Sequence, residues 1–280
     1  MKLKEYFKRL ARYIIKGVPE YYIKVEVKES MPTEQLKGRN IIVTGAGSGL
    51  GYYIAKRCIA EGANVLITGR NESKLRKASD ELGSCCNWLV FDSSNVEGMQ
   101  DFIRHAQKVF KGEKIHGLVS NAGISFHEGN FRNVTEEGWN LQMNTNLKGN
   151  YFLVKSFIQY LESLEDKSGN VVVITSERSR RSDDIPYGLS KVASNSFIEC
   201  MASQVIEEGI RINGVAPGVT ASDMTGVDRN KNMYAEWQPS NRFFLPEEVA
   251  EVVNFLLSDT SNCISGEIIA CNQGRHISCW

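Results

Sequence analysis

The fold of this chain is decided by one glycine-rich stretch, Thr44-Gly45-Ala46-Gly47-Ser48-Gly49-Leu50-Gly51. A short apolar, strand-like segment at residues 40–44 comes before it, and a helical pattern follows as far as residue 60. Glycines at this point let the turn close and let backbone N–H groups approach a pyrophosphate at the start of the helix. A plain tight turn would also use glycines, but the strand before it and the helix after it favour a dinucleotide site.

Outward from this stretch, strand-like and helix-like segments alternate along the chain. Helices are expected near residues 73–82 and 96–110. Further strands are expected at residues 64–68, 88–91, 118–120, 171–174, 210–215 and 267–270. Their near-continuous apolar character is typical of parallel strands that are buried on both faces. Right-handed crossovers then predict an α/β fold, with a Rossmann-type doubly wound parallel sheet and helices on both faces.

The composition is that of an ordinary globular protein. Of the 280 residues, 42% are hydrophobic and 24% are charged, which suits one large α/β domain or two small ones. Lys and Arg together number 33, as do Asp and Glu, so the net charge is zero and indicates no nucleic-acid partner. The seven cysteines include no C-x-x-C pair, and we expect reduced thiols in the cytoplasm, with neither a disulfide framework nor a metal site.

Residues 1–35 are expected to form an extension that precedes a catalytic domain at residues 36–280. Residues 1–16 have the pattern of a basic amphipathic helix, and residues 21–27 that of a short strand or extended arm. The helix has three interpretations: it packs on the domain or a neighbouring subunit, lies on an anionic membrane, or docks an acidic partner. No apolar run has transmembrane length and no secretory signal is present, so a cytoplasmic or peripheral membrane location is expected.

Arg70 follows the second predicted strand, where NAD-binding sites usually carry an acidic residue for the adenosine ribose. Gly69, just before it, supplies no such group. A planar guanidinium suits a 2′-phosphate well, so the position favours NADP(H) over NAD(H) as the cofactor. A solvated surface arginine is the alternative interpretation.

Tyr187 and Lys191 form the second chemical signal. Residues four apart lie on the same face of a helix, so the phenol and the ammonium point the same way. A nearby cation favours the phenolate, which lowers the pKa of a tyrosine from its usual value of about 10. An isolated pair of this kind would more often be an ordinary surface feature, so the interpretation depends on what accompanies it.

The accompanying motifs resemble those of the short-chain dehydrogenase/reductase family, in its single-domain short form. The resemblance runs from about Leu36 to Gly274. The matching residues are Thr44 to Gly51 for TGxxxGxG, Asp92 with Ser93 after the third strand, Asn121-Ala122-Gly123, Asn146, Ser176, Tyr187 and Lys191 for YxxxK, and Pro217-Gly218 followed by Thr220 and Ser222.

This resemblance implies a seven-stranded sheet and hydride transfer between a nicotinamide cofactor and a carbonyl or alcohol. Tyr187 would be the general acid or base, and Ser176 would hydrogen-bond the reacting oxygen. Lys191 would bind the nicotinamide ribose and lower the pKa of Tyr187, while Asn146 would hold a water of the proton relay. The loop between Ser176 and Tyr187 is shorter than is usual in the family, and Ser179 is the alternative catalytic serine.

The resemblance also bears on partners. Family members pair through helices that correspond here to residues 146–161 and 187–205, so a homodimer or homotetramer is expected. Two function classes remain open: a working oxidoreductase, or a non-catalytic NAD(P)-binding regulatory or scaffolding protein. A sugar epimerase is a weaker alternative, because those relatives carry a longer C-terminal domain.

The substrate is a small molecule whose identity the sequence leaves open. Arg178 and Arg181 lie in the loop that joins Ser176 to Tyr187, and they suggest an anionic substrate, either sugar-linked or a carrier-linked 3-oxoacyl group. The alternative is that these arginines pair with Asp183 and Asp184. Residues 223–245, which we call the lid, contain apolar side chains that either clamp an apolar substrate part or belong to the core or a subunit contact.

Overall fold

The computed structural model describes residues 21–27 and 30–277. Its single sheet has seven strands, all parallel, in the order β3-β2-β1-β4-β5-β6-β7. The strands are β1 (Asn40–Thr44), β2 (Asn64–Gly69), β3 (Cys86–Val90), β4 (Gly117–Ser120), β5 (Gly169–Ile174), β6 (Ile210–Pro217) and β7 (Ile268–Cys271). The predicted fold class is confirmed, and the strand ends differ from the predicted ones by one or two residues.

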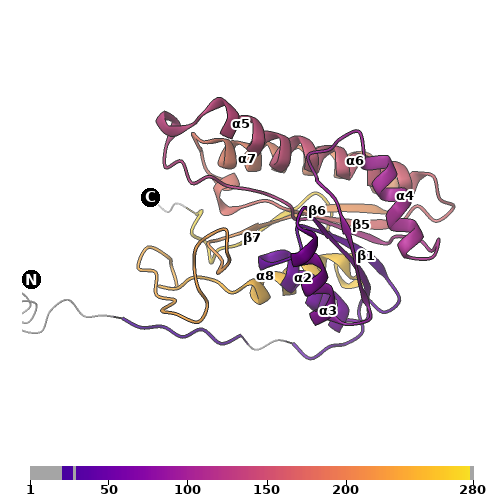
Figure 1. The fold of residues 1–280 in the computed structure, drawn as a ribbon, viewed down its shortest axis with the longest axis horizontal. Helices are drawn as coiled ribbons and strands as arrows, with labels where there is room; N and C mark the ends of the chain where they lie inside the picture. Colours follow the sequence, from indigo (N-terminus) through magenta and orange to yellow (C-terminus); the bar gives the residue numbers. More distant parts are fainter. Residues whose placement is uncertain (1–20, 28–29, 278–280) are drawn as a thin grey trace, which may run out of the picture.

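Helices cover both faces of this sheet (Figure 1). One layer contains α4 (Met99–Val109), α6 (Asn150–Glu162) and α7 (Pro186–Val205). The other contains α2 (Gly49–Ala60), α3 (Glu72–Leu82) and α8 (Pro246–Leu257). Each layer buries its apolar stripe against the sheet and forms its own core, one around Phe157 and one around Ile54. The β-branched strands are buried between these two cores, as their continuous apolar sequences require.

Two helices and one turn go beyond the predicted elements. Helix α5 (Glu136–Met143) begins at Thr135, whose side chain accepts a hydrogen bond from the backbone N–H of Gly138. Helix α8 begins with a proline at its first turn, where the missing N–H costs nothing. Residues 146–149, expected as the start of a regular helix, instead belong to a π-helical turn, η2 (Asn144–Gly149), that joins α5 to α6.

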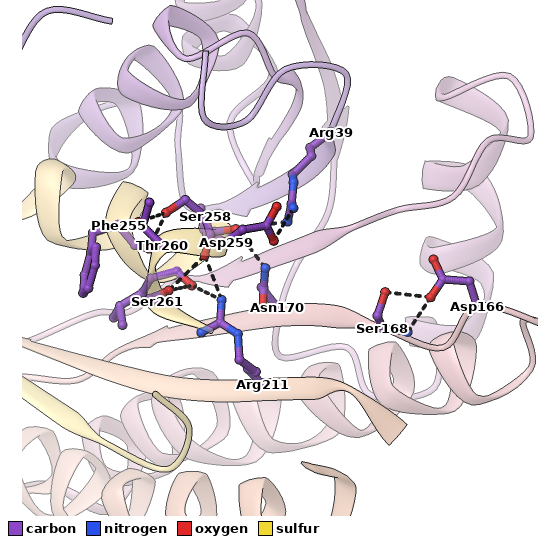
Figure 2. Close-up of polar contacts among 12 residues, drawn as sticks. Arg39, Asp166, Ser168, Asn170, Arg211, Phe255, Ser258, Asp259, Thr260 and Ser261 are labelled. Atoms are coloured by element: carbon purple, nitrogen blue, oxygen red, sulfur yellow. Dashed lines mark hydrogen bonds and ion pairs between the residues drawn. The ribbon is translucent and has the colours of Figure 1, made fainter. Parts of the chain in front are cut away.

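A polar network holds the end of α8 at the amino ends of strands β5 and β6 (Figure 2). The Arg211 guanidinium donates to the carbonyl oxygens of Leu256 at 2.9 Å and of Ser258 at 3.1 Å. The Asn170 amide donates to the Leu257 carbonyl at 2.8 Å. Since the last carbonyls of a helix have no partner within it, these side chains satisfy them and hold α8 to the sheet.

The extension before the domain is attached at two places. Arg57 and the buried Glu61 form an ion pair on α2, and Glu61 also accepts the backbone N–H groups of Thr33 and Gln35 at 3.0 and 3.1 Å. Residues 21–27 run as an extended arm along the lid, and the predicted helix at residues 1–16 lies outside the described residues. Within the described ranges, no helix combines the length and the apolar character needed to cross a membrane.

Candidate active site

The glycine-rich turn between β1 and α2 is built for close approach. Gly45 and Gly49 have φ values of +64° and +58°, a region that favours glycine. A Cβ at Gly45 would lie 2.9 Å from the Ala122 Cα, and one at Gly51 would lie 2.6 Å from the Asn121 amide nitrogen. The turn therefore tolerates no side chains at these positions and presents its backbone to the space above it.

The end of β4 holds this turn in place. The Thr44 hydroxyl accepts the backbone N–H groups of Asn121 at 3.0 Å and of Ala122 at 3.1 Å. The Asn121 side-chain amide donates back to the Thr44 carbonyl at 2.8 Å. Strands β1 and β4 are neighbours at the point where the strand order reverses, and this is where a parallel sheet leaves room for a nucleotide.

A cavity of about 540 Å³ opens above the carboxyl ends of β1, β4, β5 and β6. It gathers residues that are far apart in the sequence, from the glycine turn, the segments after β4 and β6, and the first turns of α7. Of the predicted site residues, those that line it are Gly45, Ser48, Gly49, Leu50, Gly51, Asn121, Ala122, Gly123, Ser176, Arg178, Arg181, Tyr187, Lys191, Pro217, Gly218, Thr220 and Ser222. A shaped cavity at this position, with converging polar groups, is typical of a cofactor and substrate site.

Two predicted cofactor residues lie beside the cavity near the start of α3. Gly47 faces α3, where a Cβ would lie 3.3 Å from the Cβ of Lys74, so its role is to let the turn and the helix pack closely. Arg70 is exposed directly after β2, and it has no hydrogen bond or ion pair with any residue of the described ranges. Its guanidinium is therefore available to a ligand group near the start of α3.

Asp92, Ser93 and Asn146 also lie outside the cavity lining. The Asp92 carboxylate accepts hydrogen bonds from the backbone N–H of Ser94 at 2.9 Å and from its hydroxyl at 2.8 Å. Ser93 is buried, and its carbonyl lies so close to Gly149 that a Cβ there would clash at 2.1 Å. These two residues shape the turn after β3 and its contact with η2.

Asn146 is fully buried in η2 and clamps the backbone of Ile124. Its side-chain oxygen accepts the Ile124 N–H, and its side-chain nitrogen donates to the Ile124 carbonyl, both at 2.8 Å. Its own carbonyl accepts a hydrogen bond from the Asn150 amide at 2.8 Å. This clamp fixes the segment that carries Gly123, where a Cβ would lie 3.7 Å from the Lys191 Nζ.

Tyr187 and Lys191 are brought together at the start of α7. Lys191 is buried and donates from Nζ to the Ile174 carbonyl at 2.8 Å; this Nζ lies 5.8 Å from the centre of the Tyr187 ring. Burial lowers the pKa of Lys191 to about 8, because the charged form loses its hydration. Burial raises the pKa of Tyr187, and a hydrogen bond with the Ser176 side chain opposes that shift.

The two candidate serines have different surroundings. The Ser176 hydroxyl lines the cavity beside Tyr187 and accepts the backbone N–H of Arg178 at 3.2 Å. The Ser179 hydroxyl is buried outside the cavity lining, where it donates to the Ser176 carbonyl at 2.7 Å and accepts from the Asn195 amide at 3.0 Å. The geometry therefore favours Ser176 over Ser179 as the group that meets a reacting oxygen.

The two loop arginines both line the cavity but differ in their partners. Arg178 forms a two-pronged ion pair with Asp183, whose side chain is only 1% exposed. This is the pairing that the sequence left open as an alternative to substrate binding. Arg181 is exposed at the cavity and makes no hydrogen bond or ion pair within the part of the chain that the structure describes.

Several cavity residues were not predicted from the sequence. They are Ser125, His127, Ile174, Thr175, Glu177, Val219 and Arg275, and Thr225 of the lid lines the cavity as well. For most of them, the only sequence signal is a position near the carboxyl end of a parallel strand, where such folds bind ligands. The lid divides into two parts: Asp223, Met224 and Trp237 line the cavity, whereas Met233 and Phe244 are buried in the core.

Comparison with known proteins agrees with this arrangement. The family model described as Enoyl-(Acyl carrier protein) reductase matches residues 45–276. A 3-oxoacyl-[acyl-carrier-protein] reductase FabG of Chlamydia pneumoniae is 30% identical over 247 residues, which cover 85% of this chain and 97% of the relative. The protein of the same name from Rickettsia bellii is 30% identical over 243 residues, with the same coverage of both chains.

Solved structures share the fold. A 3-ketoacyl-(acyl-carrier-protein) reductase of Brucella melitensis, solved with NADH, superposes with a TM-score of 0.79 at 24% identity and covers 86% of this chain and 100% of its own. A short chain dehydrogenase of Mycobacterium smegmatis gives a TM-score of 0.76 at 26% identity and covers 88% of this chain and 96% of its own. With the motifs and the cavity described above, these matches show that the chain belongs to the short-chain dehydrogenase/reductase family of NAD(P)-dependent oxidoreductases.

Proposed function

We propose that the chain is an NADP(H)-dependent reductase that converts the carbonyl of a 3-oxoacyl thioester into an alcohol. The observation that carries this proposal is the convergence of Tyr187, Ser176 and Lys191 on one cavity beside the glycine turn. The names of the relatives from Chlamydia and Rickettsia support the substrate class. A cofactor-binding scaffold without turnover would have no need of a proton-transfer tyrosine at the cavity.

Tyr187 acts as the general acid. Reduction of a ketone places negative charge on the former carbonyl oxygen, and that charge needs donors at the same point. In this proposal the Tyr187 phenol gives its proton to this oxygen, and the Ser176 hydroxyl donates a second hydrogen bond to it. The raised pKa of Tyr187 keeps the phenol protonated at neutral pH, as an acid must be before it reacts.

Lys191 makes it easier for Tyr187 to donate its proton. Its Nζ lies close to the Tyr187 ring, and a positive charge there favours the phenolate that remains after proton transfer. Asn146 acts indirectly, because its two hydrogen bonds to the Ile124 backbone position the segment beside Lys191. A bound nicotinamide supplies the hydride.

The cofactor is held by the glycine turn and the segment after β6. The backbone of Gly45, Gly49 and Gly51 leaves the space that a pyrophosphate requires, because a Cβ at Gly45 or Gly51 would meet neighbouring atoms. Thr220 and Ser222 border the same cavity where the family holds the carboxamide. The exposed Arg70 supports NADP(H) over NAD(H), since its guanidinium is free to pair with a 2′-phosphate.

Arg181 is the better candidate for an anionic part of the substrate. It lies at the cavity without a described partner, whereas the guanidinium of Arg178 is occupied by Asp183. A carrier-linked or coenzyme-linked acyl group brings phosphate charges to the mouth of such a cavity. Replacing Arg181 by Ala is therefore expected to raise KM for the thioester more than replacing Arg178 does.

The test of the proposed function is Tyr187→Phe, which keeps the ring and removes the acidic proton. With NADPH and acetoacetyl-coenzyme A, we expect turnover to fall about 10²- to 10⁴-fold while NADPH binding, followed by its fluorescence, is retained. Tyr22→Phe, on the exposed arm, is the control and should leave both unchanged. Full turnover in Tyr187→Phe would rule out this mechanism, and wild-type protein that binds NADPH but reduces no ketone would favour the scaffold.

A further inference from the structure

Three residues from separate parts of the chain meet at the substrate end of the cavity. Glu177 directly follows Ser176, Arg275 lies after β7, and Trp237 belongs to the lid. All three line the cavity. We call them the Glu177–Arg275–Trp237 bridge.

The first half of the bridge is an ion pair in a sheltered place. The Glu177 side chain is only 8% exposed, and its carboxylate pairs with the Arg275 guanidinium. The Asn272 amide lies 3.4 Å from the other carboxylate oxygen of Glu177 and donates to it. A carboxylate that is removed from water needs such partners, so Glu177 depends on the segment after β7 for its position.

The second half joins this ion pair to the lid. The Arg275 guanidinium lies 4.3 Å from the centre of the Trp237 ring, within the range of a cation–π contact. Trp237 is 48% exposed, and its ring packs edge-to-face with that of Phe243, with 5.6 Å between the ring centres. Arg275 therefore covers a face of the lid's most exposed apolar cavity residue and also neutralises the carboxylate next to Ser176.

We infer that Arg275 is a positioning residue that sets the distance between the lid and the loop carrying Ser176, and so determines how tightly the substrate end of the cavity closes on the acyl group. This inference rests on the proposed function. Arg275 touches no reacting atom in this scheme: it acts through Glu177 on one side and Trp237 on the other. Within the described residues, the three side chains of the bridge make no hydrogen bond, ion pair or aromatic contact with the glycine turn, so cofactor binding should not depend on the bridge.

The experiment combines KM with a measurement that needs no substrate. In Arg275→Gln, we expect KM for acetoacetyl-coenzyme A to rise about tenfold, kcat to fall less, and NADPH affinity to stay unchanged. Trp237 emission is obtained as the difference between each protein and the same protein with Trp237→Phe. Its quenching by acrylamide should increase in Arg275→Gln because the indole loses its cover. Unchanged KM or unchanged quenching in Arg275→Gln would overturn the inference.

Two further variants separate positioning from general damage. Glu177→Gln combined with Arg275→Gln leaves no unpaired buried charge, so it should fold and have the same KM as Arg275→Gln alone, because both substitutions break one bridge. Arg275→Lys keeps the charge for Glu177 but loses the flat guanidinium over the indole, so kcat should recover while KM stays raised. Additive effects in the double variant would contradict the coupling.

Arg242 is the matched control. It also belongs to the lid, pairs with a glutamate (Glu248, at 2.6 Å) and lies over an aromatic ring (Phe244, at 5.4 Å), but it does not line the cavity. Arg242→Gln should therefore leave KM and Trp237 quenching within about twofold of wild type. An equal rise in KM in Arg242→Gln would mean that any loosening of the lid raises KM, and it would contradict the specific role inferred for Arg275. If Tyr187→Phe remains active, the proposed function fails, whereas Trp237 quenching still tests the bridge.

Discussion

Lys191 is a residue whose burial opposes stability, and in our proposal it acts on Tyr187. Its pKa falls from 10.5 to about 8 because the ammonium is removed from water. Between these two values the unfolded chain binds more protons than the folded one, so stability rises with pH across this window. Below pH 8, burial of the charged ammonium lowers the free energy of unfolding by the full amount, which is about 3 kcal/mol for a shift of this size.

We therefore predict that Lys191→Met abolishes turnover and stabilises the cofactor-free protein. At pH 7 the free energy of unfolding should rise by about 2 kcal/mol, after allowance for the lost hydrogen bond to Ile174. The gain should shrink at pH 9.5, where part of the penalty has already gone from wild type. Urea unfolding at both pH values measures this. Lys108→Met, at an exposed position, is the control, and a gain that does not depend on pH would contradict the explanation.

Arg70 decides the cofactor preference in our proposal. Arg70→Ala is expected to weaken NADPH binding about 10- to 100-fold, the loss of a charge-assisted contact to the 2′-phosphate, and to leave NADH binding unchanged. Calorimetry with both cofactors measures this directly. Arg76→Ala, on the nearby helix α3, removes an exposed arginine that already pairs with Glu72 and should change neither affinity. Equal binding of NADH and NADPH by wild type would contradict the assignment.

At the scale of elements, the arm and the lid form one unit. Ile23 donates its N–H to the Asn232 side chain at 3.0 Å and accepts the Met233 N–H at 3.0 Å. The Asn232 amide donates to the Tyr21 carbonyl at 2.8 Å, and the Tyr21 and Tyr234 rings stack at 5.2 Å. Apolar residues of the arm also complete a small core beneath the lid, so the arm holds down a segment that borders the cavity.

We predict that Asn232→Ala loosens this unit without unfolding the domain. Two hydrogen bonds to the arm are lost, so the amide protection of Ile23 and Met233 against hydrogen exchange should fall about tenfold, while strand β5 is unaffected. Asn230→Ala is the control, because it removes the same amide two positions earlier in the lid, where the side chain makes no bond within the described residues. Protection that is unchanged in Asn232→Ala would mean that apolar contacts alone hold the arm.

At the scale of the whole molecule, one face has an apolar groove on which we expect a second subunit to pack. Helices α5, α6 and α7 present an apolar groove lined by Met143, Leu147, Tyr151, Phe152, Phe197 and Met201. Tyr151 remains 39% exposed in this groove, and Val192 of α7 is 40% exposed. Apolar side chains in such a concentration are typical of a subunit interface, and the helices are those through which the family pairs.

We expect a homodimer or homotetramer in solution that depends on this face. Tyr151→Glu places a charge in the interface and should reduce a tetramer to dimers or a dimer to monomers, as measured by light scattering after size exclusion. Val90→Glu adds the same charge at an exposed position on the edge strand β3 and should leave the mass unchanged. A monomeric wild type, or an unchanged mass in Tyr151→Glu, would contradict this expectation.

The sequence by itself determined the fold and the centre of the site. Continuous apolar runs and the glycine stretch predicted the parallel strands, and a spacing of four on one helix brought Tyr187 and Lys191 together, because these signals depend on residues close in the chain. Only the tertiary structure distinguished the surroundings of Ser176 from those of Ser179 and revealed the pairing of Glu177 with Arg275, which lie 98 positions apart. Such contacts depend on how separate elements pack, and local periodicity carries no information about which distant side chains will face each other.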